Sequence, residues 1–252
     1  MTSSPHNVLL IDFDNYFKKD INDYNEKEIE FHLIRFIEEV LKRAPDVEKI
    51  SLRLYGGWFE DEHLSKRAST AMQLFSKISI FPIHLQIQNR LIHGEIEFVT
   101  ELIQIPRFKW LHTYKERAGI PHIRINKENI DAVCENSKDL CPAFILSSFT
   151  KSKTKFCKVP GCTNIQKDIF FTREQKMVDT LIACDIISLF QDPNIHSIFL
   201  ISEDMDHLPA LAFGSYKKND SKKVYLCISN ENIIPVFNSI MNNFGIEIIL
   251  LL

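Results

Sequence analysis

The sequence predicts an α/β fold, a three-layer α/β/α sandwich whose central sheet is mostly parallel. Short, almost wholly apolar runs such as Val8–Ile11 and His196–Ser202 are typical of central parallel strands, which are buried on both faces. These runs alternate with longer segments whose apolar residues recur every three or four positions, as in amphipathic helices. A chain of 252 residues is long enough for one such domain with a substantial insertion.

The first half of the predicted domain alternates strands and helices. The run Val8–Ile11 leads into Asp12, and an amphipathic helix at Glu26–Ala44 follows, which Pro45 ends. The next predicted elements are a strand at Lys49–Tyr55, a helix at His63–Ile78 and a strand at Ile80–Gln86. Pro82 argues against a central place for this last strand, because proline donates no hydrogen bond to a neighbouring strand.

The alternation returns at Glu174, after a region without a clear period. The segment from Glu174 to Phe190 has a broad apolar face and predicts a largely buried helix. The later predicted elements are the strand His196–Ser202, a helix at Leu208–Tyr216, the strand Val224–Ser229, a helix at Asn232–Asn242 and the strand Gly245–Leu251. The final apolar run is far shorter than the roughly 20 residues of a membrane span, so we expect no membrane association.

The irregular range 88–171 is expected to form an insertion or subdomain within a single domain over 1–252. It contains Cys134, Cys141, Cys157 and Cys162. The sequence Pro160-Gly161 supplies a tight turn between the last two, so the four thiolates can be read as a structural Zn²⁺ site. Free thiols packed within the subdomain are the alternative interpretation.

Composition narrows the functional classes. The net charge is −3, so the chain as a whole has no basic footprint for nucleic acid, and with 7 glycines a glycine-rich phosphate loop is not expected. No cationic region precedes a long apolar core near the N-terminus, so no secretory signal is expected. Six cysteines in such a chain indicate a reducing compartment, which predicts a cytoplasmic location.

The functional prediction rests on acids at the ends of predicted elements. Asp12 ends the first strand, whereas Asp204 and Asp206 follow the strand His196–Ser202. Asp179 lies in the first turns of the buried helix, where the positive helix end favours an anion. Sites in open α/β sheets lie beyond the carboxyl ends of the strands, where the strand order reverses. If the two strands are neighbours, the four carboxylates converge.

Converging carboxylates imply a cation, because several of them cannot all stay ionised side by side without one. Oxygen ligands select Mg²⁺ or Mn²⁺, which activate water and offset the charge of a phosphodiester. Two of the four acids also have a structural explanation: Asp206 fits a helix N-cap and Asp179 a solvent-facing helix position. Asp185 is six residues, about 240° around the helix, from Asp179, so we expect it to form structural hydrogen bonds.

Three segments together resemble the signature segments of the NYN branch of PIN-like nuclease domains. They are VLLIDFDNYF, EQKMVDTLIACDII and IFLISEDMDHLPAL, and the resemblance covers roughly residues 6–85 and 172–252. It implies a PIN-like fold and a metal-dependent ribonuclease with four carboxylates that bind Mg²⁺ or Mn²⁺. By motif, the matching residues are Asp12 and Asn15 in the first segment, Lys176, Asp179 and Asp185 in the second, and Ser202, Asp204 and Asp206 in the third. Three residues depart from the pattern: Met177 and Glu203 replace glycines, and His207 replaces an aromatic residue.

The resemblance and the chemistry together assign roles. Asp12, Asp179 and Asp204 are expected to hold the metal, with Asp206 as a fourth ligand or a base that orients water. On the substrate side, Asn15 is expected to position a phosphate or to hold the Asp12 loop. Ser202 is expected to bond a ligand carboxylate or to be a strand-end hydroxyl, and Lys176 is a candidate substrate-binding residue.

Single-stranded RNA is the expected partner, and homo-oligomerisation is a second expectation. Two basic runs can bind phosphates, and aromatic residues in the second can stack on bases. The runs are Lys151, Lys153, Lys155 and Lys158, and Arg107, Lys109, Lys115 and Arg117 with Trp110, His112 and Tyr114. A solvated surface is the alternative interpretation of both runs.

Two other functions remain open from the sequence. Asp12-Phe13-Asp14 at a strand end mimics the nucleophile pair of haloacid-dehalogenase-like phosphohydrolases. That class also needs a Ser or Thr at the end of the next strand, whereas this strand ends Tyr55-Gly56-Gly57. The other alternative is a PIN-like module that binds RNA or a protein partner without catalysis.

Overall fold

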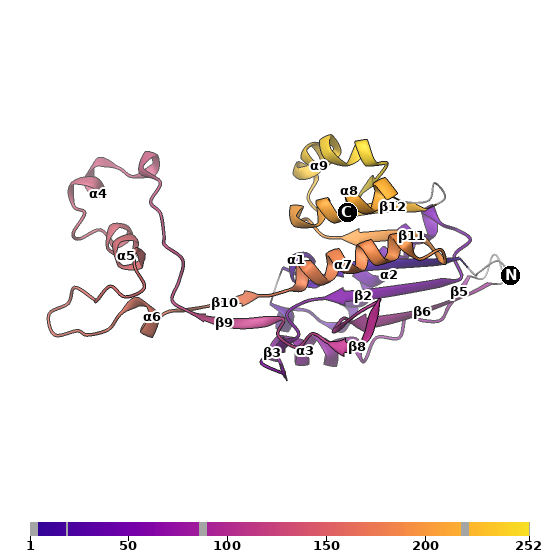
Figure 1. Cartoon of the computed structure of the whole chain (residues 1–252), viewed down its shortest axis with the longest axis horizontal. Coiled ribbons are helices and arrows are strands. Elements are labelled where there is room, and N and C mark those ends of the chain that lie inside the picture. Colours follow the sequence, from indigo (N-terminus) through magenta and orange to yellow (C-terminus); the bar gives the residue numbers. More distant parts are fainter. Residues whose placement is uncertain (1–4, 19, 86–89, 218–221, 252) are drawn as a thin grey trace. The chain divides into compact units, whose positions relative to one another are not determined.

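The computed structural model describes residues 5–18, 20–85, 90–217 and 222–251 (Figure 1). The chain divides into two compact units. Unit 1 consists of Met1–Tyr114 and Gln175–Leu252, and unit 2 is Lys115–Glu174. Each unit is described separately below.

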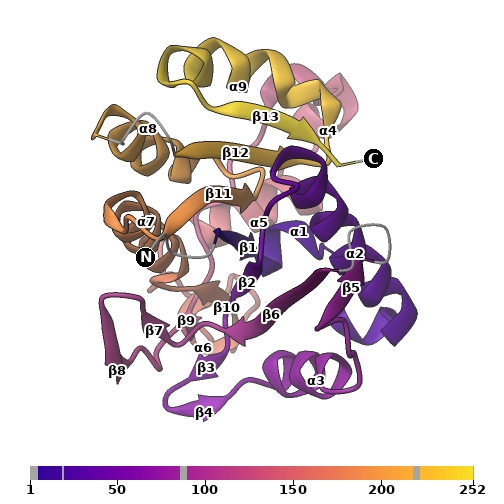
Figure 2. The same ribbon diagram turned by 90° about the vertical axis from the view of Figure 1, so that its right-hand side faces the viewer.

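Unit 1 is built on a seven-stranded sheet with the order β13-β12-β11-β1-β2-β6-β5 (Figure 2). Its strands are β1 (His6–Asp12), β2 (Lys49–Tyr55), β5 (Ile83–Leu85), β6 (Arg90–Phe98), β11 (Ile195–Ile201), β12 (Lys223–Ile228) and β13 (Glu247–Leu250). Among the described residues, the neighbouring strands of this sheet are parallel except β5 with β6, which are antiparallel. The structure therefore confirms the α/β class with a mixed, mostly parallel sheet.

The strand order reverses beside β1. The strands β2 and β6 lie on one side of β1, and β11, β12 and β13 follow one another on the other side. β1 and β11 are in parallel register from Asn7, paired with Ser197, to Ile11, paired with Ile201. The two strands that lead into the acidic motifs are thus neighbours at the switch point of the sheet, where ligand sites of such folds form.

Alternate residues of β1 contribute to two hydrophobic clusters. Leu9 and Ile11 belong to the cluster that includes α2 (Glu26–Arg43) and α3 (Lys66–Phe75). Val8 and Leu10 belong to the cluster of α7 (Val178–Gln191), α8 (Leu208–Lys217) and α9 (Ile234–Met241). Because successive strand residues point to opposite faces, apolar side chains cover both faces of the sheet. In Figure 2, α7 and α8 lie on one side of the sheet and α2 on the other.

Local signals fix the ends of α2. The side chain of Asn25 accepts a hydrogen bond from the backbone N–H of Glu28, whose carboxylate accepts one from the N–H of Asn25, a capping box. The helix ends at Arg43, two residues before Pro45, as predicted. The strand β2 has the predicted bounds. β5 is an edge strand, in agreement with the argument from Pro82.

Pairing between strands changes three predicted elements. The helix predicted from Glu174 begins at Val178, because Glu174 and Gln175 belong to β10 (Phe171–Gln175). The helix predicted from His63 begins at Lys66, because β4 (His63–Leu64) pairs with β3 (Phe59–Glu60). β6 lies within the predicted insertion 88–171, yet it pairs with β2 in the central sheet.

The shorter elements of unit 1 complete its description. β7 (Glu101–Leu102) pairs with β8 (Ile105–Lys109), and the four-residue helix α1 (Phe13–Tyr16) directly follows β1. Glu60 of β3 pairs with Tyr114, the first residue of β9 (Tyr114–Ala118). The other residues of β9 belong to unit 2, where β9 and β10 are neighbours. No described helix is long and apolar enough to cross a membrane.

Unit 2 contains short helices and little buried surface. Its helices are α4 (Ala132–Asn136), α5 (Pro142–Thr150) and α6 (Gln166–Ile169). All residues of this unit are described, and only Gly119, Thr150 and Gln166 are buried. Unit 2 therefore has no hydrophobic core of the kind that supports unit 1.

Candidate metal centre

The structure brings the four predicted acids together at the switch point of the sheet. Oxygens of Asp179, Asp204 and Asp206 lie within 4.8 Å of one another. Ligand atoms of Asp12, Asp179 and His207 also lie within 4.8 Å of one another. The acids come from the end of β1, the first turn of α7 and the segment after β11. The two groups share Asp179, so one connected site contains all five side chains.

Asp12 is the buried carboxylate of the cluster, with 3% of its surface exposed. Its Oδ2 accepts a hydrogen bond from the Ser202 hydroxyl at 2.9 Å and lies 3.3 Å from Nε2 of His207. Its Oδ1 accepts a bond from the backbone N–H of Asn15 at 3.3 Å, which caps α1. These partners come from both neighbouring segments and hold the carboxylate in one orientation.

The segment after β11 is organised around Ser202 and Asp204. The backbone N–H of Asp204 donates to the Ser202 hydroxyl at 3.0 Å, and that hydroxyl in turn donates to Asp12. Asp204 caps the 3₁₀ turn Met205–His207, because its Oδ1 accepts a bond from the N–H of Asp206 at 2.9 Å. The cap is therefore Asp204 rather than Asp206, and Asp206 remains exposed.

Asp179 is the acid shared by both groups. Its side chain reaches solvent, yet partial burial raises its pKa, and the neighbouring carboxylates of Asp12, Asp204 and Asp206 raise it further, against the influence of His207. A raised pKa means that the ionised form is disfavoured in the absence of a cation. The electrostatics of the site thus favour positive charge close to Asp179.

His207 is the residue that sequence reasoning missed. It is fully buried, its Nε2 faces Asp12, and its Nδ1 has no hydrogen-bond partner among the described residues. In the sequence it stood out only as a departure from an aromatic position. A histidine directly after Asp206, in a segment already rich in metal-ligand types, is the signal that could have identified it.

Glu203 and Asn15 stabilise the loop between the acids. The Glu203 carboxylate bonds the Lys18 ammonium at 2.5 Å and the Ser229 hydroxyl at 2.5 Å. Burial opposes ionisation of Glu203, but hydrogen bonds from Lys18 and Ser229 lower its pKa. The Asn15 side-chain oxygen accepts a bond from the Glu203 N–H at 2.9 Å. Asn15 therefore holds the loop, one of its two predicted roles, and Glu203 is paired outside the cluster.

Asp14 and Asp185 have separate partners. Asp14 bonds the Arg67 guanidinium at 2.7 Å and the Gly57 N–H at 3.0 Å. Asp185 is fully buried and accepts bonds from the Tyr55 hydroxyl at 2.7 Å and the Arg53 guanidinium at 2.9 Å. A third bond to Asp185 comes from the backbone N–H at position 103 at 2.9 Å. The predicted structural role of Asp185 is confirmed.

The four cysteines of unit 2 do not form one cluster. A hydrogen bond with Cys141 raises the pKa of Cys134, so these two thiols lie close together. Among the described residues, no three cysteine sulfurs lie within 4.8 Å of one another, so Cys157 and Cys162 do not complete a site with the first pair. The predicted four-thiolate Zn²⁺ geometry is therefore not present in the structure.

The remaining predicted residue, Lys176, is exposed and precedes the α7 acid by three positions. Its backbone N–H donates to the carbonyl of Thr113 at 3.0 Å, which fixes the chain before the start of α7. Met177 then takes a left-handed conformation with φ of 63°. This conformation explains why glycine suits the position, since only glycine adopts it without strain.

Comparison of the chain with protein-family models, with curated proteins and with solved structures gives no match.

Proposed function

We propose that this chain is a metal-dependent ribonuclease, in which a cluster of Asp carboxylates binds Mg²⁺ or Mn²⁺ and hydrolyses RNA phosphodiester bonds. The observation that carries the proposal is the position of Asp179, whose carboxylate lies within 4.8 Å of ligand atoms of Asp12 on one side and of Asp204 and Asp206 on the other. These acids come from three separate stretches of chain. Structural caps and turns need no such convergence, whereas a shared hard cation does.

The chemistry of the donors fits these ions. Carboxylate oxygens suit Mg²⁺ and Mn²⁺ rather than soft metals. The Nε2 of His207 lies at 3.3 Å from Asp12, the distance of a hydrogen bond, so we assign His207 to orienting Asp12. Asp12, Asp179 and Asp204 then supply the oxygen ligands. With His207 assigned to Asp12, all the proposed metal ligands are oxygen atoms.

Each side chain has a defined task in this proposal. The carboxylates of Asp12, Asp179 and Asp204 hold the ion, and the exposed Asp206 orients the attacking water. When bound, Mg²⁺ or Mn²⁺ lowers the pKa of water and offsets charge on the phosphate. Ser202 is only 1% exposed, and its hydroxyl already bonds Asp12 and the Asp204 N–H. We therefore assign it to positioning the metal-binding carboxylates rather than to contacting the substrate.

The proposed fold type is the PIN-like sandwich with an inserted subdomain. Helices contribute to clusters on both faces of the sheet. The acids lie at the end of β1, in the first turn of α7 and after β11, as the motif resemblance implies. In this proposal the insertion corresponds to unit 2, Lys115–Glu174, rather than to the whole range 88–171. β6 belongs to the catalytic domain because it extends the central sheet.

Specific contacts disfavour the phosphohydrolase alternative. In that class, the second acid of Asp12-Phe13-Asp14 must face the reacting phosphate. Here Asp14 is paired with Arg67 and with the Gly57 N–H, and it also bonds the Gln175 amide. A module that only binds RNA or protein would not need carboxylates from three segments to lie this close together.

A cleavage assay tests the proposal and separates the alternatives. Purified protein is incubated with labelled single-stranded RNA in Mn²⁺, in Mg²⁺ and in EDTA, and in parallel with a small phosphate monoester. We expect RNA fragments with either metal and none in EDTA. Phosphate release from the monoester without RNA cleavage would instead support the phosphohydrolase, and RNA binding without any hydrolysis would support the non-catalytic module.

Replacing Ser202 by Ala should weaken the site without removing a ligand. Loss of the hydroxyl removes bonds to both Asp12 and the Asp204 N–H. Residues that orient ligands typically contribute about 10- to 100-fold to metal affinity or activity. The Mn²⁺ concentration at half-maximal cleavage should therefore rise by about tenfold. Ser229→Ala is the matched control, because its hydroxyl bonds Glu203 outside the cluster; an equal change in both variants would refute the assigned role of Ser202.

A further inference from the structure

Unit 2 exposes apolar side chains that a free-standing surface does not require. Val133 is 73% exposed, Leu140 82%, Phe156 63% and Val159 62%. Between Lys115 and Glu174, where every residue is described, no residue with an apolar side chain is buried. Exposed apolar groups gathered in one small unit are typical of a binding surface.

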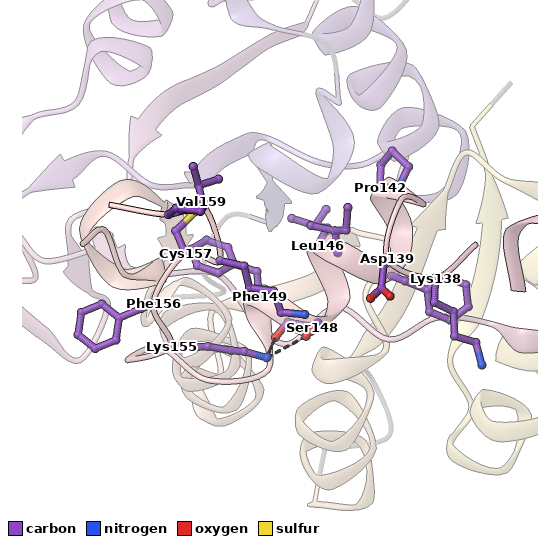
Figure 3. Close-up of a pocket in the computed structure, with 14 residues that line it drawn as sticks. Lys138, Asp139, Pro142, Leu146, Ser148, Phe149, Lys155, Phe156, Cys157 and Val159 are labelled. Carbon is purple, nitrogen blue, oxygen red and sulfur yellow. Dashed lines mark hydrogen bonds between the residues drawn. The ribbon is translucent and has the colours of Figure 1, made fainter. Parts of the chain in front are cut away.

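Two of these side chains, Phe156 and Val159, line a pocket of about 860 Å³. Three aromatic residues, Phe144, Phe149 and Phe156, line it together with three lysines, Lys138, Lys155 and Lys158. Figure 3 shows Phe149 and Leu146, both of α5, together with Cys157 and Val159 of the segment that follows the helix. The volume falls in the range of small-molecule sites, so a nucleotide can fit more readily than a folded helix.

The charge of unit 2 is opposite to that of unit 1. Its 11 Lys and Arg against 7 Asp and Glu give a net charge of +4, within a chain of net −3. Unit 1 therefore carries a net charge of −7, which repels a phosphate backbone. A basic unit on the same chain can supply the attraction that the acidic unit lacks.

The lysines of the pocket are placed beside its polar and aromatic walls. The Lys155 ammonium donates to the Ser148 carbonyl at 3.1 Å and to its hydroxyl at 2.8 Å (Figure 3). The Lys138 ammonium lies 5.7 Å from the centre of the Phe144 ring. Cations interleaved with aromatic rings suit a ligand that is both anionic and flat.

We propose that this pocket binds single-stranded RNA, with bases against the phenylalanine rings and phosphates near the lysines. The proposal rests on the ribonuclease function and gives that function its substrate-binding element. Bases stack on aromatic side chains with little dependence on sequence, and lysines attract the backbone. An acidic peptide would match the positive charge of the pocket equally well, but it has no flat bases to stack on the phenylalanine rings. RNA tethered at unit 2 is also held at a raised local concentration for the acids of unit 1.

Binding is tested separately from cleavage, on the full chain with Asp204→Asn and EDTA present. Fluorescence anisotropy follows a labelled U-rich RNA of about 15 nucleotides. Adding Phe156→Ala should raise Kd by about tenfold, the size of one lost base stack. Adding Lys158→Glu should raise Kd and lower the dependence of log Kd on log salt by about 1 or more. Phe156 is mostly exposed, so its truncation should leave the circular dichroism spectrum unchanged.

Matched variants outside the pocket control for loss of an aromatic group or a charge. Phe171→Ala removes a ring that is 55% exposed, and Lys127→Glu reverses an exposed charge in the same unit. Both should bind RNA within about twofold of the parent. The proposal is overturned if the parent does not bind RNA, if the pocket variants bind like the controls, or if an acidic peptide binds more tightly than RNA.

The two proposals can fail independently. Pocket-dependent RNA binding without cleavage in Mn²⁺ would support the pocket and refute the ribonuclease function. The second case uses Phe156→Ala in the otherwise wild-type chain. If this variant cleaved RNA with an unchanged KM, RNA binding by the pocket would be refuted and the ribonuclease function would stand. If both proposals hold, this variant should have a raised KM and an unchanged kcat, because Phe156 is not part of the acidic cluster.

Discussion

Replacing Asp204 by Asn should reduce RNA cleavage on the order of a thousandfold. The substitution removes one of the negative oxygens that converge with Asp179 and Asp206. A metal ion typically contributes several kcal/mol of charge stabilisation, and each loss of about 1.4 kcal/mol lowers the rate tenfold. The measurement is the single-turnover rate on labelled RNA at a fixed Mn²⁺ concentration.

This substitution is chosen because it preserves the local fold. Asp204 caps the turn Met205–His207 through its Oδ1, and Asn is an equally good N-cap. The matched control is Asp46→Asn, which removes the same charge from an exposed turn outside the site. Asp46→Asn should cleave at the wild-type rate. Equal cleavage by the Asp204→Asn variant would show that Asp204 does not take part in the chemistry.

Replacing Arg53 by Met should reduce the free energy of unfolding by about 3–5 kcal/mol, the usual effect of leaving one partner of a buried pair uncompensated. Asp185 is fully buried, and Arg53 is its charged partner at 2.9 Å. Without Arg53, the carboxylate keeps only the hydroxyl of Tyr55 and one backbone N–H. Urea denaturation, followed by circular dichroism, measures the loss.

Two comparison variants identify the cause of this loss. Lys42→Met breaks an ion pair with Glu39 in which the lysine side chain is 64% exposed, and should cost about 0.5 kcal/mol or less. The double variant Arg53→Met with Asp185→Leu removes both charges and should recover part of the stability. If Arg53→Met were no more destabilising than Lys42→Met, the buried pair would not stabilise the fold as described.

The sequence predicts most elements of unit 1 because their signals are local. β2 has the predicted bounds, and α2 begins beside its Asn25 capping box and ends before Pro45. The position of Asp12 at the end of a buried strand could likewise be predicted from neighbouring residues alone. What the sequence could not supply was the pairing of β1 with β11, which decides that the acids meet.

The incorrect predictions concern contacts between residues that are far apart in the chain. Glu174 was assigned to a helix because its neighbours show helical spacing, but strand pairing places it in β10. His207 contacts Asp12 across 195 positions, and no local pattern indicates that contact. The structural role of Asp185 could be predicted from its helical angle to Asp179, whereas its partner Arg53 could not.

Unit 2 was the least predictable part for a related reason. Apolar periodicity indicates secondary structure only where one face of an element is buried, and unit 2, all of whose residues are described, has only three buried residues. The cysteine spacings suggested a shared ion, but Cys134 and Cys141 approach each other without the other pair. The basic run Lys151–Lys158, together with Lys115 and Arg117 of the second run, is the part of this unit that the sequence links to RNA.

The central claim is that acids from distant segments share a hard cation, and a Mn²⁺ titration tests it most directly. Asp179 belongs to both ligand groups, so one substitution affects the whole site. Isothermal titration calorimetry should show Mn²⁺ binding to the wild-type chain, with affinity weakened by about tenfold or more in Asp179→Asn. Asp46→Asn should bind Mn²⁺ as the wild type does. Equal Mn²⁺ affinity in the wild-type chain and the Asp179→Asn variant would contradict the account.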